Sequence, residues 1–286
     1  MHKSFLERAL EFLTPTETKR LELILVFLVE KGHELDYIVD CYMTVLDDMT
    51  NEQMYFFRHG EYRHKTYADV ADSVYHDKSY MDRYMYGLAL TAFFWPNHVE
   101  IARFFERTFP IAKGGRYLEV GPGHGYFMAI AAERGEFDEM LGIDISEASI
   151  AQTRGLLARF APAASARCEL RVADFHDSAS LMPESFDAVV MGEVIEHVED
   201  PDTFLRRVWE LARDDAYICV TTGINAPAID HLYLWRTTDE LEEMFEDCGF
   251  RIRDALRLPY EGRTLEQSRK QNLPIRVAYI LEKVRS

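Results

Sequence analysis

The sequence of 286 residues contains few cysteines and no long apolar run. Its four cysteines, Cys41, Cys168, Cys219 and Cys248, are scattered without a Cys-x-x-Cys pair, which excludes a disulfide-based scaffold and indicates free thiols in a reducing compartment. The most apolar stretch, residues 23–29, is far too short to span a bilayer, and no signal-peptide core follows the N-terminus. We therefore expect a soluble, cytoplasmic protein.

The sequence also lacks a strong cluster of Lys and Arg residues that would predict a basic surface. Lys and Arg number 32 against 49 Asp and Glu, so the formal net charge is −17. Such an acidic chain repels a phosphate backbone unless it carries a local basic stripe. Residues 263–270 come nearest to a basic cluster, but their mixed charges are more typical of a solvated loop or helix. The composition therefore argues against a nucleic-acid partner.

The first 110 residues lack strand-like alternation and are rich in aromatic side chains, holding 20 of the 36 Phe, Tyr and Trp residues. Thr14, Pro15 and Glu17 form a capping-box pattern that predicts the start of a helix. This helix and those that follow are expected over 14–31, 35–46, 51–58, 66–75, 79–95 and 97–109. The chain is thus predicted to begin with a helical domain, residues 1–110, followed by a second domain, residues 111–286.

The segment 75–86 carries four tyrosines at helical spacing together with Arg83. A stripe of this kind usually packs against neighbouring helices. Tyrosine also suits the wall of a small-molecule pocket, because it offers both apolar area and a hydroxyl. Both interpretations stay open at this point. For the second, the candidate substrate-binding residues are Tyr80, Arg83 and Tyr84.

From residue 115 the pattern changes to alternating strands and helices. Seven strand-like runs lie at 116–120, 140–145, 170–173, 186–191, 216–221, 250–254 and 277–281. Strands separated by helices of ordinary length predict an α/β fold with a mostly parallel sheet and helices on both faces. Ligands bind such sheets outside the carboxyl ends of the strands, at the switch point. The helical first domain is then expected to act as a cap over the site.

A glycine-rich turn connects the first of these strands to the following helix. Its glycines are Gly121, Gly123 and Gly125. They allow a ligand to approach the backbone amides closely. In a dinucleotide fingerprint the third glycine falls five residues after the first, but Tyr126 occupies that position here. Asp144, near the end of the second strand, is placed to accept hydrogen bonds from both hydroxyls of a ribose.

In this combination the sequence resembles the class I S-adenosylmethionine-dependent methyltransferases. Residues 119–125 match their first motif, Asp144 their ribose-binding acid, and Asp174-Phe175 the segment that flanks adenine. The resemblance covers about 115–284. It implies a seven-stranded, mostly parallel, Rossmann-like sheet with an antiparallel last strand, and S-adenosyl-L-methionine as the methyl donor. The cofactor-binding residues that it implies are Glu119, Gly121, Gly123, Gly125, Asp144, Ile145, Asp174, Phe175 and Glu193.

A second motif follows the fourth strand. In a helix, Glu193, Glu196 and His197 would lie on one face, and His231 follows the neighbouring fifth strand. Two carboxylates and two imidazoles suit a divalent cation such as Mg²⁺, Mn²⁺ or Zn²⁺. The Glu-x-x-Glu-His pattern with a later His resembles the metal site of small-RNA 2′-O-methyltransferases and the corresponding segment of ubiquinone-pathway O-methyltransferases.

Three roles for this motif stay open at this point. Glu193, Glu196, His197 and His231 hold a metal, or His197 or His231 acts as a catalytic base in a metal-free site, or the side chains only brace the structure. We expect methyl transfer to a small-molecule acceptor, and the metal motif favours oxygen as the methylated atom. The alternatives are an RNA 2′-O-methyltransferase, which the net charge of −17 disfavours, and a non-catalytic donor-binding or scaffold subunit. The acceptor and the oligomeric state are left open.

Overall fold

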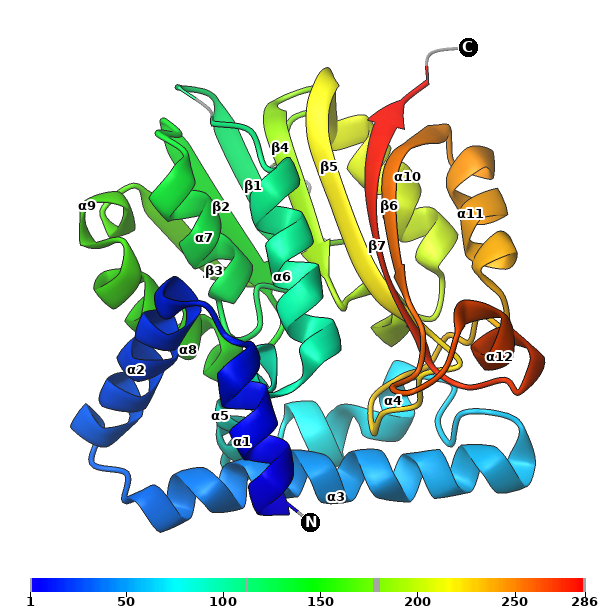
Figure 1. The fold of residues 1–286 in the computed structure, drawn as a ribbon. Coiled ribbons are helices and arrows are strands. Elements are labelled where there is room, and N and C mark those ends of the chain that lie inside the picture. The colour runs from blue at the N-terminus through cyan, green and yellow to red at the C-terminus, as the bar shows by residue number, and fades with distance from the viewer. Residues whose placement is uncertain (1, 112, 177–180, 285–286) are drawn as a thin grey trace.

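The structure, a computed structural model, describes residues 2–111, 113–176 and 181–284. Figure 1 shows a twisted sheet with helices on both faces, and the long helix α3, Leu35–His59, lies across the lower end of the strands. Among the described residues, no helix is both long and apolar enough to cross a bilayer.

The described residues before β1 form helices and no strand, as predicted. They are α1 His2–Phe12, α2 Pro15–Glu30, α3 Leu35–His59, α4 Tyr67–Val70, a π-helical turn Ala71–Tyr75, α5 Lys78–Phe94 and α6 Pro96–Thr108. The capping box that the sequence predicts for α2 is present, because Thr14 and Glu17 bond reciprocally to each other's backbone N–H.

One expectation for this region is wrong, and one helix lies outside the predicted ranges. Two helices are expected over 35–46 and 51–58, but α3 is continuous across both. The reason is that Glu52 is buried on the same helix as Val45 and Phe56, with its charge paired to Arg63 at 2.9 Å. The polar stretch that suggests a break between two helices is therefore part of the packed face of a single helix, α3. Helix α1, which no predicted range covers, packs against α5.

The sheet contains seven strands in the order β3-β2-β1-β4-β5-β7-β6. These are β1 Arg116–Val120, β2 Glu139–Asp144, β3 Cys168–Val172, β4 Phe186–Gly192, β5 Ala212–Ile224, β6 Phe250–Leu258 and β7 Ile275–Lys283. Strand β7 is antiparallel to β5 and β6, and the other paired strands are parallel. The mostly parallel sheet and its antiparallel last strand are thereby confirmed. The order reverses between β1 and β4, so a ligand crevice is expected at their carboxyl ends.

Two clusters of buried side chains cover the two faces of the sheet. The helices after β1 are α7 Tyr126–Arg134, α8 Glu147–Phe160, α9 Pro162–Ser165, α10 Pro201–Leu211, α11 Thr238–Asp247 and α12 Leu265–Lys270. One cluster joins α6, α7 and α8 to the sheet, and the other joins α10 and α11. Tyr117 and Leu118 of β1 belong to different clusters, because successive side chains of a strand point to opposite faces.

The helices that precede the sheet share one of these cores with it. Phe105 of α6 and Tyr117 of β1 lie in the same buried cluster. Gly155 of α8 faces the ring of Phe27 of α2 so closely that a Cβ atom at this position would lie 2.4 Å from Phe27 Cε2. The boundary between the two domains after residue 110 stays a prediction.

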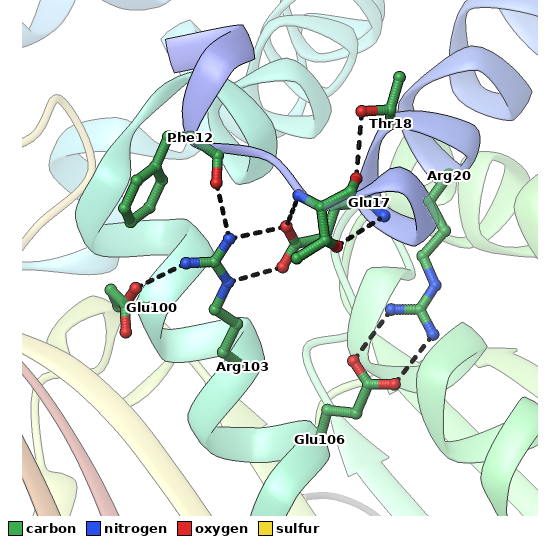
Figure 2. Close-up of polar contacts among 8 residues, drawn as sticks. Phe12, Glu17, Thr18, Arg20, Glu100, Arg103 and Glu106 are labelled. Carbon is green, nitrogen blue, oxygen red and sulfur yellow. Dashed lines mark hydrogen bonds and ion pairs between the residues drawn. The ribbon is translucent and has the colours of Figure 1, made fainter. Parts of the chain in front are cut away.

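Buried ion pairs fasten α2 to the body of the protein (Figure 2). The guanidinium of Arg103 donates to the two carboxylate oxygens of Glu17 at 2.7 and 2.8 Å. Arg20 donates to Glu106 of α6 at 3.1 and 3.2 Å and to Glu133 of α7 at 2.6 Å. Because Arg20 is only 6% exposed, these bonds offset the desolvation of its charge. They join α2 to two helices of the sheet layer.

We expect Arg20→Met to lower the free energy of unfolding by about 1–3 kcal/mol, because two half-buried glutamates lose a charged hydrogen-bond donor. Urea denaturation followed by circular dichroism measures the change. Arg107→Met is the matched control, since Arg107 lies exposed on α6, and should shift the value by no more than about 0.5 kcal/mol. Equal stabilities of the two variants would contradict the role given to Arg20.

Candidate active site

The loop after β1 fits between two neighbouring segments only because glycines occupy it. Gly121 and Gly125 have φ values of 63° and 82°, in the left-handed region that favours glycine. A Cβ atom on Gly121 would lie 2.6 Å from Val194 Cγ2 in the segment after β4. One on Gly125 would lie 2.8 Å from the Cα atom of Thr153 on α8. The glycines therefore set how closely this loop approaches both segments.

Asp144 holds the same loop from the end of β2. Its Oδ2 accepts a hydrogen bond from the Gly123 N–H at 3.2 Å, and its Oδ1 accepts one from Ser146 at 2.8 Å. Burial raises the pKa of Asp144 to about 6, because the charged form loses hydration. This carboxylate is the group that we expect to accept the ribose hydroxyls of the donor.

A cavity of about 640 Å³ lies at the carboxyl ends of β1 to β4, where the strand order reverses. Its volume falls within the range of about 300–1,000 Å³ that is typical of small-molecule sites. Phe175 forms a flat wall, with its ring 4.7 Å from that of Phe204. The predicted donor-binding residues that line the cavity are Gly121, Gly123, Asp144, Ile145, Asp174, Phe175 and Glu193.

Glu119 and Gly125 are the two predicted donor-binding residues that do not line this cavity. Glu119 is 2% exposed and accepts a hydrogen bond from the Tyr117 hydroxyl. Burial raises the pKa of Glu119 to about 8, so the side chain holds a proton at neutral pH. Gly125 is the residue that precedes α7 and packs on Thr153. The structure thus places both of them behind the loop, and their contact with the donor stays a prediction.

The segment after β4 does not form the helix that would place Glu193, Glu196 and His197 on one face. Glu193 has a φ of 54°, and Ile195–His197 form a single 3-10 turn. Glu196, His197 and His231 nevertheless come together, because one ligand atom of each lies within 4.8 Å of the others. We call these three residues the Glu-His-His cluster. It joins the segment after β4 to the one after β5.

Glu196 and His231 of the Glu-His-His cluster are buried, and His197 is partly exposed to the cavity. Glu196 is fully buried, and neither of its carboxylate oxygens has a hydrogen-bond partner among the described residues. His231 is 4% exposed, and its Nε2 lies 3.9 Å from Glu196 Oε1. A buried carboxylate without a partner is costly unless a proton or a cation neutralises it. One carboxylate and two imidazoles fit a divalent cation in both charge and ligand type.

Asp230, which is not among the predicted site residues, orients His197. The His197 Nδ1 lies 3.2 Å from Asp230 Oδ2 and 3.0 Å from the Asp230 carbonyl oxygen. Since both are acceptors, Nδ1 carries the hydrogen and Nε2 is left to face a ligand, as is usual for metal-binding histidines. Tyr75 donates to the same carboxylate at 3.2 Å. Burial opposes both charges, but the pairing raises the pKa of His197 to about 10 and lowers the pKa of Asp230 to about 2. The free imidazole is therefore protonated at neutral pH, and a cation bound at Nε2 would have to displace that proton.

Glu193 has partners outside the cluster. Its Oε1 accepts a hydrogen bond from the Thr221 hydroxyl at 2.9 Å, and its Oε2 pairs with Arg276 of β7. Of the four residues expected to bind a metal together, the structure therefore brings three into one cluster and holds the fourth beside it. Because the backbone at Glu193 is left-handed, the helical spacing on which the prediction relied does not apply here.

Of the three predicted substrate-binding residues, Tyr84 lines the cavity, whereas Tyr80 and Arg83 do not; that Tyr84 contacts a substrate stays a prediction. The Tyr80 hydroxyl donates to Asp48 at 2.7 Å, and Arg83 donates to Thr44 Oγ1 at 3.2 Å, so both are engaged with α3. Met81, Tyr84 and Met85 share one face of α5 by their spacing, a signal that could have selected them. The cavity residues that are not among the predicted site residues include Tyr67, Tyr75, Met81, Met85 and Asp230, although Tyr75 belongs to the tyrosine-rich segment 75–86.

Comparisons with known proteins agree with this fold. Residues 118–218 match a family model described as a methyltransferase domain. The ubiquinone biosynthesis O-methyltransferase of Pseudomonas savastanoi pv. phaseolicola is 27% identical over 193 residues, which cover 60% of this chain and 79% of that protein. The enzyme of the same name from Neisseria meningitidis serogroup C is 35% identical over 123 residues, covering 43% and 49%.

Solved structures share the fold at low sequence identity. Phosphoethanolamine N-methyltransferase 2 of Haemonchus contortus, in complex with S-adenosyl-L-methionine, superposes with a TM-score of 0.56 at 17% identity, covering 77% of this chain and 60% of that one. Geranyl diphosphate C-methyltransferase of Streptomyces coelicolor A3(2) gives a TM-score of 0.55 at 14% identity, covering 70% and 84%.

The domain match, the methyltransferase relatives and the seven-stranded sheet identify the chain as a class I S-adenosylmethionine-dependent methyltransferase. It is therefore an enzyme, and S-adenosyl-L-methionine is its methyl donor.

We expect the affinity for the product S-adenosylhomocysteine to fall as the pH drops below about 6, because protonation of Asp144 removes the charge that accepts the ribose hydroxyls. At pH 5 the dissociation constant should be raised by about tenfold, since each pH unit below the pKa lowers the ionised fraction tenfold. Isothermal titration calorimetry between pH 5 and 7.5 measures this.

Asp144→Asn should weaken S-adenosylhomocysteine binding at pH 7 by about 1–3 kcal/mol. It should also remove the step in affinity near pH 6. Asp174→Asn is the control, because Asp174 borders the same cavity but is exposed, and it should keep the step. A step that survives in Asp144→Asn would show that another group causes it.

Proposed function

We propose that this methyltransferase transfers the methyl group to an oxygen of a small-molecule acceptor, and that Glu196, His197 and His231 hold a divalent cation. The observation that carries the proposal is the buried Glu196 carboxylate, unpartnered among the described residues, beside two imidazoles at the edge of the donor cavity. The named activity of the relatives, O-methylation in ubiquinone biosynthesis, supports oxygen as the acceptor atom.

The chain's own residues mainly orient the reactants. Methyl transfer from a sulfonium is an in-line displacement, so the protein supplies position and a deprotonated nucleophile. In the proposed complex, Asp144 accepts the ribose hydroxyls, and Asp174 and Phe175 flank the adenine. The reacting end of the donor is then directed toward Glu193 and His197, which line the same cavity.

His197 connects the donor cavity with the Glu-His-His cluster, because it belongs to both. Asp230 fixes its ring through Nδ1, and Tyr75 in turn fixes the Asp230 carboxylate. A cation bound at the cluster would lower the pKa of an acceptor hydroxyl and hold its oxygen in place. His231 is neutral and does not line the cavity, so it serves better as a ligand than as a base that contacts the acceptor.

The acceptor side of the cavity is apolar and aromatic. Met81, Tyr84 and Met85 line it from α5, and Tyr75 lines it from the π-helical turn. Burial raises the pKa of Tyr75 and of Tyr84 well above the ordinary value, so both hydroxyls stay neutral. These side chains suit a small hydroxylated compound with an apolar body. No specific observation favours RNA, and the net charge of −17 opposes it.

Chelation tests the cation. After exhaustive dialysis against EDTA, formation of S-adenosylhomocysteine should fall by about two orders of magnitude or more, the scale of a lost catalytic group. Addition of Mg²⁺, Mn²⁺ or Zn²⁺ should restore it. Glu196→Gln should lower the rate similarly with metal present, whereas Glu199→Gln, which changes an acid outside the cluster, should keep the metal dependence. Full activity after chelation would rule out the cation.

A panel of phenols, alcohols, amines and thiols, assayed by mass spectrometry of the methylated product, tests the acceptor atom. We expect methylation of a hydroxyl compound and a KM for it that rises about two- to tenfold in Tyr84→Leu, the loss of one aromatic contact. Tyr86→Leu is the matched control, because Tyr86 is equally buried on α5 but bonds Lys31 outside the cavity. Methylation of nitrogen or sulfur alone, or equal KM changes in both variants, would contradict the proposal.

A further inference from the structure

Arg276 is a nearly buried arginine beside the candidate site. It lies at the start of β7 with 9% of its surface exposed, and it is paired in register with Gly223 near the end of β5. A Cβ atom on Gly223 would lie 3.0 Å from Arg276 Nη1, so the glycine leaves room for the guanidinium. The guanidinium donates a hydrogen bond to Glu193 Oε2. The pairing of β5 with β7 thus places the positive charge of Arg276 next to the segment that follows β4.

The carboxylate of Glu193 could bind a cation, but it pairs with residues outside the Glu-His-His cluster. Glu193 precedes Glu196 by three residues, and its carboxylate is shared between the Thr221 hydroxyl and Arg276. Like Glu196, it lies in the short segment between β4 and α10, and like His197 it lines the donor cavity. The backbone at Glu193 is left-handed, with a φ of 54°, a conformation that is unfavourable for a residue other than glycine. The surrounding contacts therefore maintain this placement.

We propose that Arg276 sets the affinity of the enzyme for its divalent cation by holding Glu193 out of the Glu-His-His cluster. This inference rests on the proposed cation site. Arg276 and a cation at the cluster compete for the same negative charge, because a carboxylate paired with a guanidinium is not free to bind metal. Removal of the guanidinium leaves the half-buried carboxylate of Glu193 without a cationic partner. Binding of a cation relieves that charge, so the cation is bound more tightly.

The test uses the full-length enzyme, freed of metal with EDTA and dialysed, and titrated with Mn²⁺ by isothermal titration calorimetry without donor or acceptor. Arg276→Met should bind Mn²⁺ about 5- to 150-fold more tightly than the wild type, the range of typical coupling between two interacting sites. Arg276→Lys, which keeps the charge, should stay near the wild-type affinity. In the Glu193→Gln background, Arg276→Met should change the affinity by less than about threefold.

The matched control is Arg257→Met. Arg257 lies on β6 and pairs with Glu242 of α11 at 2.6 Å, so its removal breaks a comparable ion pair away from the cluster and should leave the Mn²⁺ affinity unchanged. If Arg276→Met does not fold, as judged by circular dichroism, Glu193→Gln alone decides the matter. It should keep the wild-type affinity, whereas Glu196→Gln should lose binding.

Each remaining outcome separates this inference from the proposed function. Equal Mn²⁺ affinities of the wild type and Arg276→Met would overturn the role of Arg276 and leave the cation site standing. Strong loss of Mn²⁺ binding in Glu193→Gln would show that Glu193 is already a ligand of the cation. That result would also overturn the role of Arg276. Absence of Mn²⁺ binding in every variant, with normal methyl transfer after chelation, would overturn both proposals. Binding seen only in Arg276→Met would support the inference.

Discussion

The close contact between Gly121 and Val194 is the constraint on which the site depends. It sets the donor loop directly against the segment that carries Glu196 and His197, because any side chain at 121 would collide with Val194 Cγ2. Asp144 holds the other side of the loop through the Gly123 N–H. The donor cavity and the Glu-His-His cluster therefore share one wall, which contains Gly121, Val194 and His197.

Pairing of carboxylates with arginines recurs through the molecule. In a chain with a net charge of −17, Arg20 and Arg103 neutralise glutamates between the helices, and Arg276 does so beside the cavity. Buried glutamates are tolerated because each of these pairs compensates its own desolvation. Glu196 is different, since no guanidinium bonds it in the described part of the chain and the His231 imidazole lies 3.9 Å from its carboxylate. Glu119 is also buried without an arginine, but it accepts a hydrogen bond from Tyr117, so Glu196 stands apart as a candidate ligand.

The strands, the glycine loop and Asp144 could be predicted from sequence, because each depends on local spacing along the chain. Arg276 could not, because its place is set by the antiparallel register of β5 and β7. Asp230 is adjacent to a predicted histidine, yet its contact with His197 depends on two separate segments meeting. The prediction for Glu193 failed in part because helical spacing assumes a right-handed backbone, and its φ is positive. Tyr80 and Arg83 face α3 because α5 packs along it.

The ion pairs of α2 also bear on the order in which the chain can fold. Arg20 meets Glu106 and Glu133, which lie 86 and 113 residues further along the sequence. During synthesis, the second helix therefore emerges long before its carboxylate partners exist. Contacts between such distant residues form late and slow folding, because the intervening chain must first be ordered. The N-terminal helices thus complete their packing only after the first strand and helix of the sheet layer have been made.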